Sequence, residues 1–234
     1  ENFEAAVDMA NQLRPAFVVI TGDLIQDPGD ARQIAAFRKV TARLDPSIPL
    51  RLVAGNHDCG NVPTEATLRG YRDAFGRDQY TFDVQGTHFI VLNTCMTHRP
   101  DNVMGRWNEQ LTFLEEGLRA AKDANAEHIV VFMHHPPFLK HRGEEDGYYA
   151  IPRKRRTPLL SLMRKFGVRA VFAGHWHRNS HGMDGSLEVV TSGPVGKPKG
   201  DTRSGIRIVE VFPDRLVHTY TPLGRVPRHL LPSD

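Results

Sequence analysis

The stretch VRAVFAGHWH (168–177) is apolar over most of its length and then ends in a glycine and two histidines. Three other stretches have the same form: AFVVITGD (16–23), IPLRLVAGNHD (48–58) and EHIVVFMHHPP (127–137). Because these runs are apolar and do not alternate, they are typical of strands that are buried on both faces. The sequence therefore predicts an α/β fold in which four buried strands each end in a short polar motif.

Amphipathic segments lie between these runs. Apolar residues recur at helical spacing in 31–44, 107–121 and 157–166. We expect a helix in each segment, and Asn108 is in a position to cap the second one.

Two further regions have the pattern of antiparallel strands. Residues 80–94 are expected to form a hairpin that turns near Gln85-Gly86, and residues 187–221 to form an antiparallel meander. The chain contains no internal repeat and no low-complexity linker. We therefore expect one compact domain over residues 1–234.

The composition excludes few classes of protein. The 234 residues include 30 Lys and Arg and 27 Asp and Glu, for a formal net charge of +3, which does not require a nucleic-acid or membrane partner. No apolar run is long enough to predict a transmembrane helix. Cys59 and Cys95 are interpreted as thiols, because a chain of this length does not need disulfides. We expect a soluble protein and leave its compartment open, with the cytoplasm favoured.

The polar motifs at the strand ends carry the candidate chemistry. Ligands of open α/β sheets bind outside the carboxyl ends of the strands, so these motifs should meet at one rim. The residues of interest there are Asp23, Asn56, His134, His175 and His177. Carboxylate, amide and imidazole ligands together suit Zn, Mn or Fe, and no cysteine is needed to complete the set. Each motif alone could be a turn, a cap or a packed histidine, but their occurrence at four strand ends favours a metal site.

The motifs GD, GNHD, HHPP and GHWH, in this order, resemble those of the calcineurin-like metallophosphoesterase superfamily, which includes the purple acid phosphatases. The chain looks most similar to the branch of calcineurin-like phosphoesterase domain-containing protein phosphatases. The resemblance implies a four-layer α/β/β/α sandwich, with two mixed β-sheets face to face and helices outside. It also implies hydrolysis of a phosphate ester by a dinuclear centre of two divalent or trivalent ions (Fe, Mn or Zn) and a metal-bound hydroxide.

The resemblance also assigns roles to residues. It implies that Asp23 bridges two metals, that Asn56, His134 and His175 complete the second metal site, and that His177 binds the first metal. We expect His175 and His177 to face the same rim from an extended chain, with Trp176 packed away. His57 is implied to be a general acid rather than a ligand, paired with Asp58.

One family motif is missing from this sequence. It lies on an earlier strand and supplies an Asp and a His or Gln to the first metal. We therefore expect the domain to be N-terminally incomplete, with a first strand that precedes Glu1 and a first metal site that is weak in this chain.

The function predicted is that of a phosphomonoesterase or phosphoprotein phosphatase, with a phosphorylated small molecule or protein as its partner. Two alternatives stay open: a phosphodiesterase that acts on nucleotides, lipids or nucleic acid, and a non-catalytic binding module with an incomplete metal site. A nucleic-acid partner is not expected. No substrate-binding residue is assigned, and the oligomeric state is left open. Lys197, Lys199 and Arg203, in the loop 193–205, could meet an anionic substrate.

Overall fold

In the computed structural model, which describes residues 1–225, a six-stranded mixed sheet has the strand order β3-β4-β5-β6-β8-β7. The four central strands run parallel, and β3 and β7 are antiparallel to their neighbours at the two edges. The bounds are β3 Tyr80–Val84, β4 Thr87–Val91, β5 His128–Phe132, β6 Ala170–Ala173, β7 Ser180–Asp184 and β8 Leu187–Thr191.

Two strand pairs make up the second sheet layer. β1 (Val18–Ile20) pairs in parallel with β2 (Leu50–Leu52). β9 (Gly205–Val211) pairs antiparallel with β10 (Leu216–Pro222). In the part of the chain described, these are separate two-stranded sheets rather than one continuous sheet.

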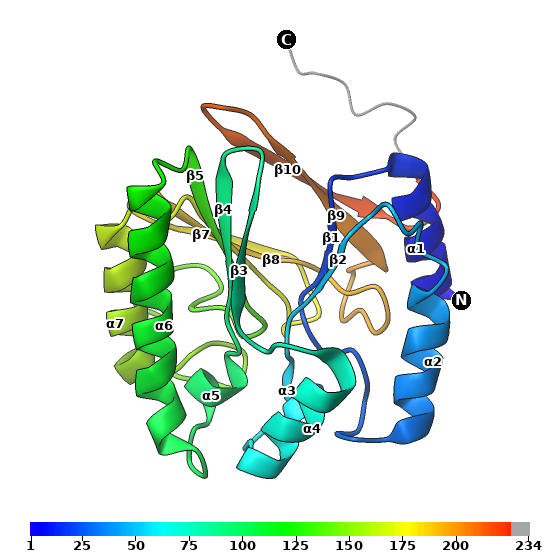
Figure 1. The fold of residues 1–234 in the computed structure, drawn as a ribbon, viewed down its shortest axis with the longest axis horizontal. Helices are drawn as coiled ribbons and strands as arrows, with labels where there is room; N and C mark the ends of the chain where they lie inside the picture. The colour runs from blue at the N-terminus through cyan, green and yellow to red at the C-terminus, as the bar shows by residue number, and fades with distance from the viewer. Residues whose placement is uncertain (226–234) are drawn as a thin grey trace.

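Helices cover the outer face of each sheet layer (Figure 1). α1 (Asn2–Leu13) and α2 (Ala31–Thr41) lie beside β1 and β2, whereas α6 (Met104–Asp123) and α7 (Arg153–Lys165) lie beside the six-stranded sheet. The remaining three helices gather at one end of the sandwich. They are α3 (Asn56–Cys59), α4 (Glu65–Phe75) and α5 (Cys95–His98).

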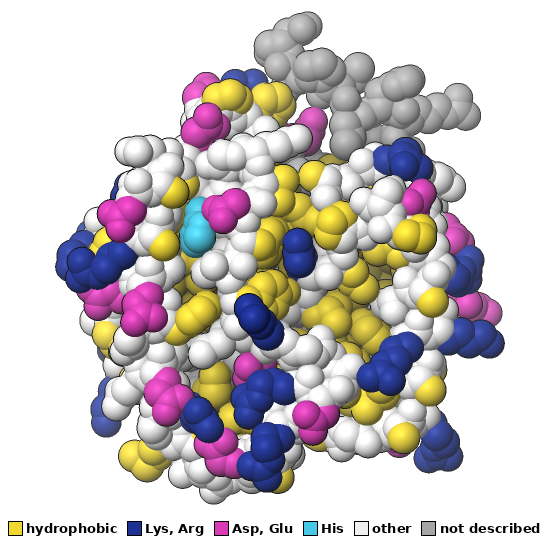
Figure 2. Space-filling view, in the orientation of Figure 1, with side chains coloured by type: hydrophobic (Ala, Val, Ile, Leu, Met, Phe, Trp, Pro, Cys, Tyr) yellow, Lys and Arg dark blue, Asp and Glu magenta, His cyan; other side chains and the backbone are white. Residues whose placement is uncertain are grey.

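The alternation of side chains along β4 explains the layers. Phe89 and Val91 enter the core between the two sheet layers, where Val53 and Phe17 also lie. Ile90 and its neighbours on the other face pack against α6 and α7. Successive residues of a strand face opposite sides, so a fully apolar strand fills two cores at once. The predicted α/β/β/α fold is confirmed. Figure 2 shows hydrophobic side chains along the middle of one face, where the edge of this sandwich reaches the surface.

The hairpin predicted for 80–94 is confirmed by β3 and β4. Gln85 and Gly86 both have positive φ, 47° and 79°, as a two-residue type I′ turn requires. The meander predicted for 187–221 is wrong in part, because β8 pairs with β6 and β7 in the large sheet while β9 and β10 form a separate hairpin. The polar strand β7 had no apolar signal in the sequence.

The three predicted helices are present as α2, α6 and α7. Asn108 is not the N-cap of α6, which begins at Met104 and has no side-chain cap. The predicted segment began at Trp107 and so left out the first turn of the helix, whose Met104 is exposed. Within residues 1–225, no helix has both the length and the hydropathy of a membrane-spanning segment.

Candidate metal centre

Four of the predicted ligands meet at one nitrogen atom. His134 Nε2 lies 2.9 Å from Asn56 Oδ1, 3.2 Å from His175 Nδ1 and 3.4 Å from Asp23 Oδ1. These residues follow β1, β2, β5 and β6, whose carboxyl ends share one end of the sandwich. His134, Asn56 and His175 are buried, so the cluster lies beneath the surface.

The hydrogen bonds behind the two imidazoles fix their orientation. His134 Nδ1 lies 2.7 Å from the Thr21 carbonyl, and His175 Nε2 lies 3.0 Å from the Tyr148 carbonyl. Since a carbonyl only accepts, each of these ring nitrogens carries the proton. The other nitrogen of each ring therefore turns a lone pair toward the centre, as in histidines that bind metals.

The donor set fits a cation. Asn56 Nδ2 donates to Asn61 Oδ1 at 3.0 Å, so the amide oxygen is the atom that faces His134. Two nitrogen lone pairs and two oxygens thus converge at distances where they repel one another unless a proton or a cation lies between them. Nitrogen and oxygen donors of this kind match the preferences of Zn, Mn and Fe.

The surroundings hold His175 and Asp23 in their metal-binding protonation states, whereas burial of His134 is outweighed by the charge of Asp23 and its hydrogen bond, which raise the pKa of His134. Burial and the neighbouring His134 lower the pKa of His175 to about 3, which keeps this ring neutral. Burial acts to raise the pKa of Asp23, but His134 and the hydrogen bond from the His57 N–H outweigh it and hold this pKa below its usual value. Asp23 is therefore a carboxylate at neutral pH.

The backbone at the centre is tightly turned. Asp23, His175 and His177 have φ values of 56°, 68° and 59°, in the left-handed region that L-residues seldom adopt. The expectation that His175 and His177 project from an extended chain was therefore wrong. Gly22 also has positive φ, and a Cβ on it would overlap His134 Nδ1. Such strained positions persist where the surrounding structure constrains them.

His177 lies beside this cluster rather than in it. Within residues 1–225, no hydrogen bond joins it to the other four candidate ligands, and its buried Nδ1 has no hydrogen-bond partner. Its carbonyl accepts from Lys199 N at 3.1 Å. An unpartnered buried nitrogen is the kind of atom that a second cation would satisfy.

His57 and Asp58 do not form the predicted pair. His57 Nδ1 lies 2.9 Å from the carbonyl of Gln26, whereas Asp58 accepts from the backbone N–H groups of Gly55 (2.7 Å), Asp23 (3.0 Å) and Ile25 (3.1 Å). Consecutive residues in a helix such as α3 point about 100° apart, which separates the two side chains.

Asp58 instead ties the loop after β1 to the loop after β2. Burial raises the pKa of Asp58 to about 7, with the charge of Asp23 acting in the same direction and the N–H groups of Gly55 and Ile25 opposing it. Through its hydrogen bond from the Asp23 N–H, Asp58 is placed to hold Asp23 in position.

The structure adds residues that the sequence did not single out. His135 is buried, has a ligand atom within 4.8 Å of those of His134 and His175, and stacks on His98 with ring centroids 4.3 Å apart. Tyr148, which the sequence gave no firm role, places its hydroxyl 3.4 Å from Asn56 Nδ2. The paired histidines of HHPP were the available signal for His135.

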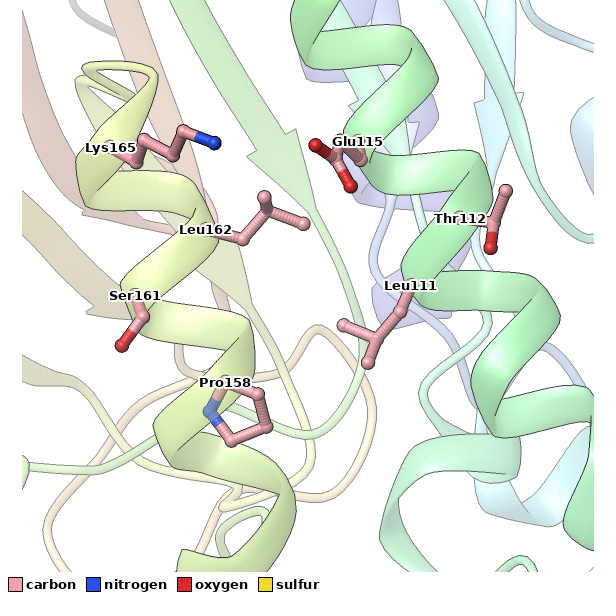
Figure 3. Close-up of a pocket in the computed structure, with 7 residues that line it drawn as sticks. All are labelled: Leu111, Thr112, Glu115, Pro158, Ser161, Leu162 and Lys165. Atoms are coloured by element: carbon pink, nitrogen blue, oxygen red, sulfur yellow. The ribbon is translucent and has the colours of Figure 1, made fainter.

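A groove between α6 and α7 is separate from this centre (Figure 3). It is lined by Leu111, Thr112, Glu115, Pro158, Ser161, Leu162 and Lys165. None of these residues belongs to the predicted site, and the two helices cover the sheet face that is turned away from β1 and β2.

A family model described as calcineurin-like phosphoesterase matches residues 1–179. The serine/threonine-protein phosphatase CPPED1 of Rattus norvegicus is 34% identical over 99% of this chain and 76% of its own length. The Homo sapiens protein of the same name is 35% identical over 95% of this chain and 73% of its own. A dimetal phosphatase from Danio rerio has a similar fold, with a TM-score of 0.70 at 19% identity over 93% of this chain and 84% of that one.

Proposed function

This chain belongs to the calcineurin-like phosphoesterase family and is a metal-dependent phosphohydrolase, and we propose that its substrates are phosphomonoesters, in particular phosphoserine and phosphothreonine side chains of proteins. The family assignment confirms the resemblance that the four strand-end motifs indicated. The observation that carries the proposal is the convergence of Asp23, Asn56 and His175 on His134 Nε2. The similarity to serine/threonine-protein phosphatases supports the substrate class.

In this proposal, Asp23, Asn56, His134 and His175 hold one cation. Asp23 also contributes to a second cation together with His177, whose Nδ1 is otherwise unpartnered. Ions such as Fe, Mn or Zn supply charge stabilisation for the phosphoryl group and activation of water.

His57 is proposed to act on the leaving group. Its backbone N–H donates to Asp23 Oδ1 at 3.0 Å, so it lies beside the metal ligands, and its side chain is only partly buried. To protonate the departing alkoxide, His57 must carry a proton on Nε2. It does so as an imidazolium whose Nδ1–H donates to the Gln26 carbonyl, or as the neutral tautomer whose Nδ1 accepts from Gln26 Nε2 at 2.8 Å. Asp58 has no such path to the substrate and is proposed to position Asp23 and α3.

The proposal is tested by comparing p-nitrophenyl phosphate, bis-p-nitrophenyl phosphate and a phosphoserine peptide as substrates with added Mn²⁺ or Zn²⁺. We expect the monoester and the peptide to be hydrolysed with higher kcat/KM than the diester. Faster hydrolysis of the diester would assign a phosphodiesterase instead. Absence of hydrolysis of all three by a metal-loaded chain would favour the non-catalytic binding module.

A further inference from the structure

The loop between β8 and β9 reaches the candidate centre. The backbone N–H of Lys199 donates to the His177 carbonyl at 3.1 Å. The Lys197 ammonium donates to Gln26 Oε1 at 2.6 Å, and the carbonyl of the same glutamine contacts His57. The loop is therefore attached to both the proposed metal ligand His177 and the proposed general acid His57.

Three cationic side chains lie on or against this loop. Lys199 Nζ lies 5.3 Å from the centroid of the Tyr149 ring, which lies 6.0 Å from the ring of His175. Arg178 follows His177 directly, and its guanidinium lies close enough to Gly200 that a Cβ there would be 3.1 Å from Nη2. We name Lys197, Lys199 and Arg178, which are all exposed, the basic rim.

The charge of the basic rim is not neutralised by the protein. In residues 1–225, no carboxylate lies within ion-pair distance of any of the three. The other lysines of these residues lack such a partner as well, so what distinguishes the basic rim is its place beside the candidate centre. A concentration of one sign of charge beside a site attracts a ligand of the opposite sign. The phosphate group of the substrate is assigned to the metals. The side chain of Gln26 lies between Lys197 and His57, so the anion that the basic rim attracts is a different group from this phosphate.

We propose that the basic rim is a second anion subsite, which selects phosphopeptides that carry acidic side chains about two residues from the phosphorylated one. An extended peptide advances about 3.3 Å per residue, so a side chain two positions away, on the same face, can reach beyond Gln26 to the rim. This inference rests on the proposed phosphatase function and names its substrate class more closely.

The experiment compares two phosphoserine peptides that differ only in Glu or Gln at the positions two residues before and after the phosphoserine. For the wild-type chain with Mn²⁺, we expect kcat/KM to be about 5- to 20-fold higher for the Glu peptide, chiefly through KM, and to lose this preference as salt is raised. In the double variant Lys199→Gln/Arg178→Gln, the ratio should fall to about 1 by the same electrostatic argument. Lys165→Gln, in the groove of Figure 3, is the matched control and should keep the wild-type ratio.

A binding measurement separates the failure of this inference from that of the proposed function. Anisotropy of the fluorescently labelled peptides reports the same preference without hydrolysis. Hydrolysis of p-nitrophenyl phosphate with no preference for the Glu peptide, in either assay, would overturn the subsite and leave the phosphatase in place. An equal preference in wild type and double variant would also overturn it. A preference in binding by a chain that hydrolyses nothing would support the subsite and refute the phosphatase.

Discussion

His134 Nε2 lies 2.9 Å from Asn56 Oδ1, although His134 follows β5 in the large sheet and Asn56 follows β2 in the other sheet layer. The candidate metal centre therefore spans the sandwich. The core of Phe89, Phe132 and Val53 between the layers sets how far apart these two strand ends lie. Packing of the two sheets and binding of the metal should consequently depend on each other.

Gly55→Ala should disrupt the centre, because a Cβ at this position would overlap the backbone N and carboxylate of Asp23. Overpacking of this kind costs about 1–3 kcal/mol. We expect that loss in urea unfolding, together with lower metal content. Gly70→Ala is the control, since nothing lies within 4 Å of its Cβ in α4, and it should be neutral or stabilising. A Gly55→Ala chain with wild-type stability and metal content would contradict this geometry.

Asp58→Asn should destabilise the fold without removing a catalytic group. The amide that replaces one carboxylate oxygen would face an N–H donor of Gly55, Asp23 or Ile25, and an unmade buried hydrogen bond costs about 1–3 kcal/mol. Urea unfolding at pH 8 measures this loss, and the exposed Asp73→Asn should change stability by less than about 0.5 kcal/mol. If Asp58→Asn instead lowered kcat strongly at unchanged stability, the original assignment of Asp58 to catalysis would be restored.

His57→Ala should lower kcat by about 10²- to 10⁴-fold while the metal content is retained. Gln26→Ala keeps the carbonyl that accepts from His57 Nδ1 and should have a smaller effect. Steady-state kinetics with p-nitrophenyl phosphate and elemental analysis of the same samples check both statements. Loss of metal in His57→Ala would show that this histidine is a ligand.

The buried His98 should make the fold sensitive to acid. Burial lowers its pKa to about 4, so the unfolded chain, with a pKa near 6.5, binds this proton first as the pH falls. Stability from this group is complete above pH 6.5 and is lost between about pH 6.5 and 4, with a loss of about 2–3 kcal/mol at pH 4.5. With chelator present, His98→Asn should show a correspondingly smaller difference in unfolding free energy between pH 7 and pH 4.5. An identical pH dependence would contradict the shifted pKa.

The sequence predicted the layers and the meeting point of the strand ends because both depend on simple patterns. Uninterrupted apolar runs identify strands buried on two faces, and such strands place Gly22-Asp23 and His134-His135 at the same end of the sandwich. The cation-binding chemistry then follows from residue types alone.

The contacts within the site depend on loop conformations that carry no periodic signal. The positive φ of His175 and His177 is one example, since neither residue type requires it. The partner of His57 is another, because Gln26 reaches it from a loop 31 residues away. The backbone contacts of Asp58 and the position of β7 were missed for the same reason.

Metal binding by His134 tests the central claim most directly. Mn²⁺ or Zn²⁺ is titrated calorimetrically into metal-free wild type, His134→Gln and the exposed control His181→Gln, and hydrolysis of p-nitrophenyl phosphate is followed in parallel. We expect wild type and His181→Gln to bind at least one ion, to lose activity on chelation and to regain it with metal. His134→Gln should bind the ion about 10- to 100-fold more weakly or not at all. Full activity of the chelated wild type, or wild-type affinity in His134→Gln, would contradict the claim that this centre holds the catalytic metal.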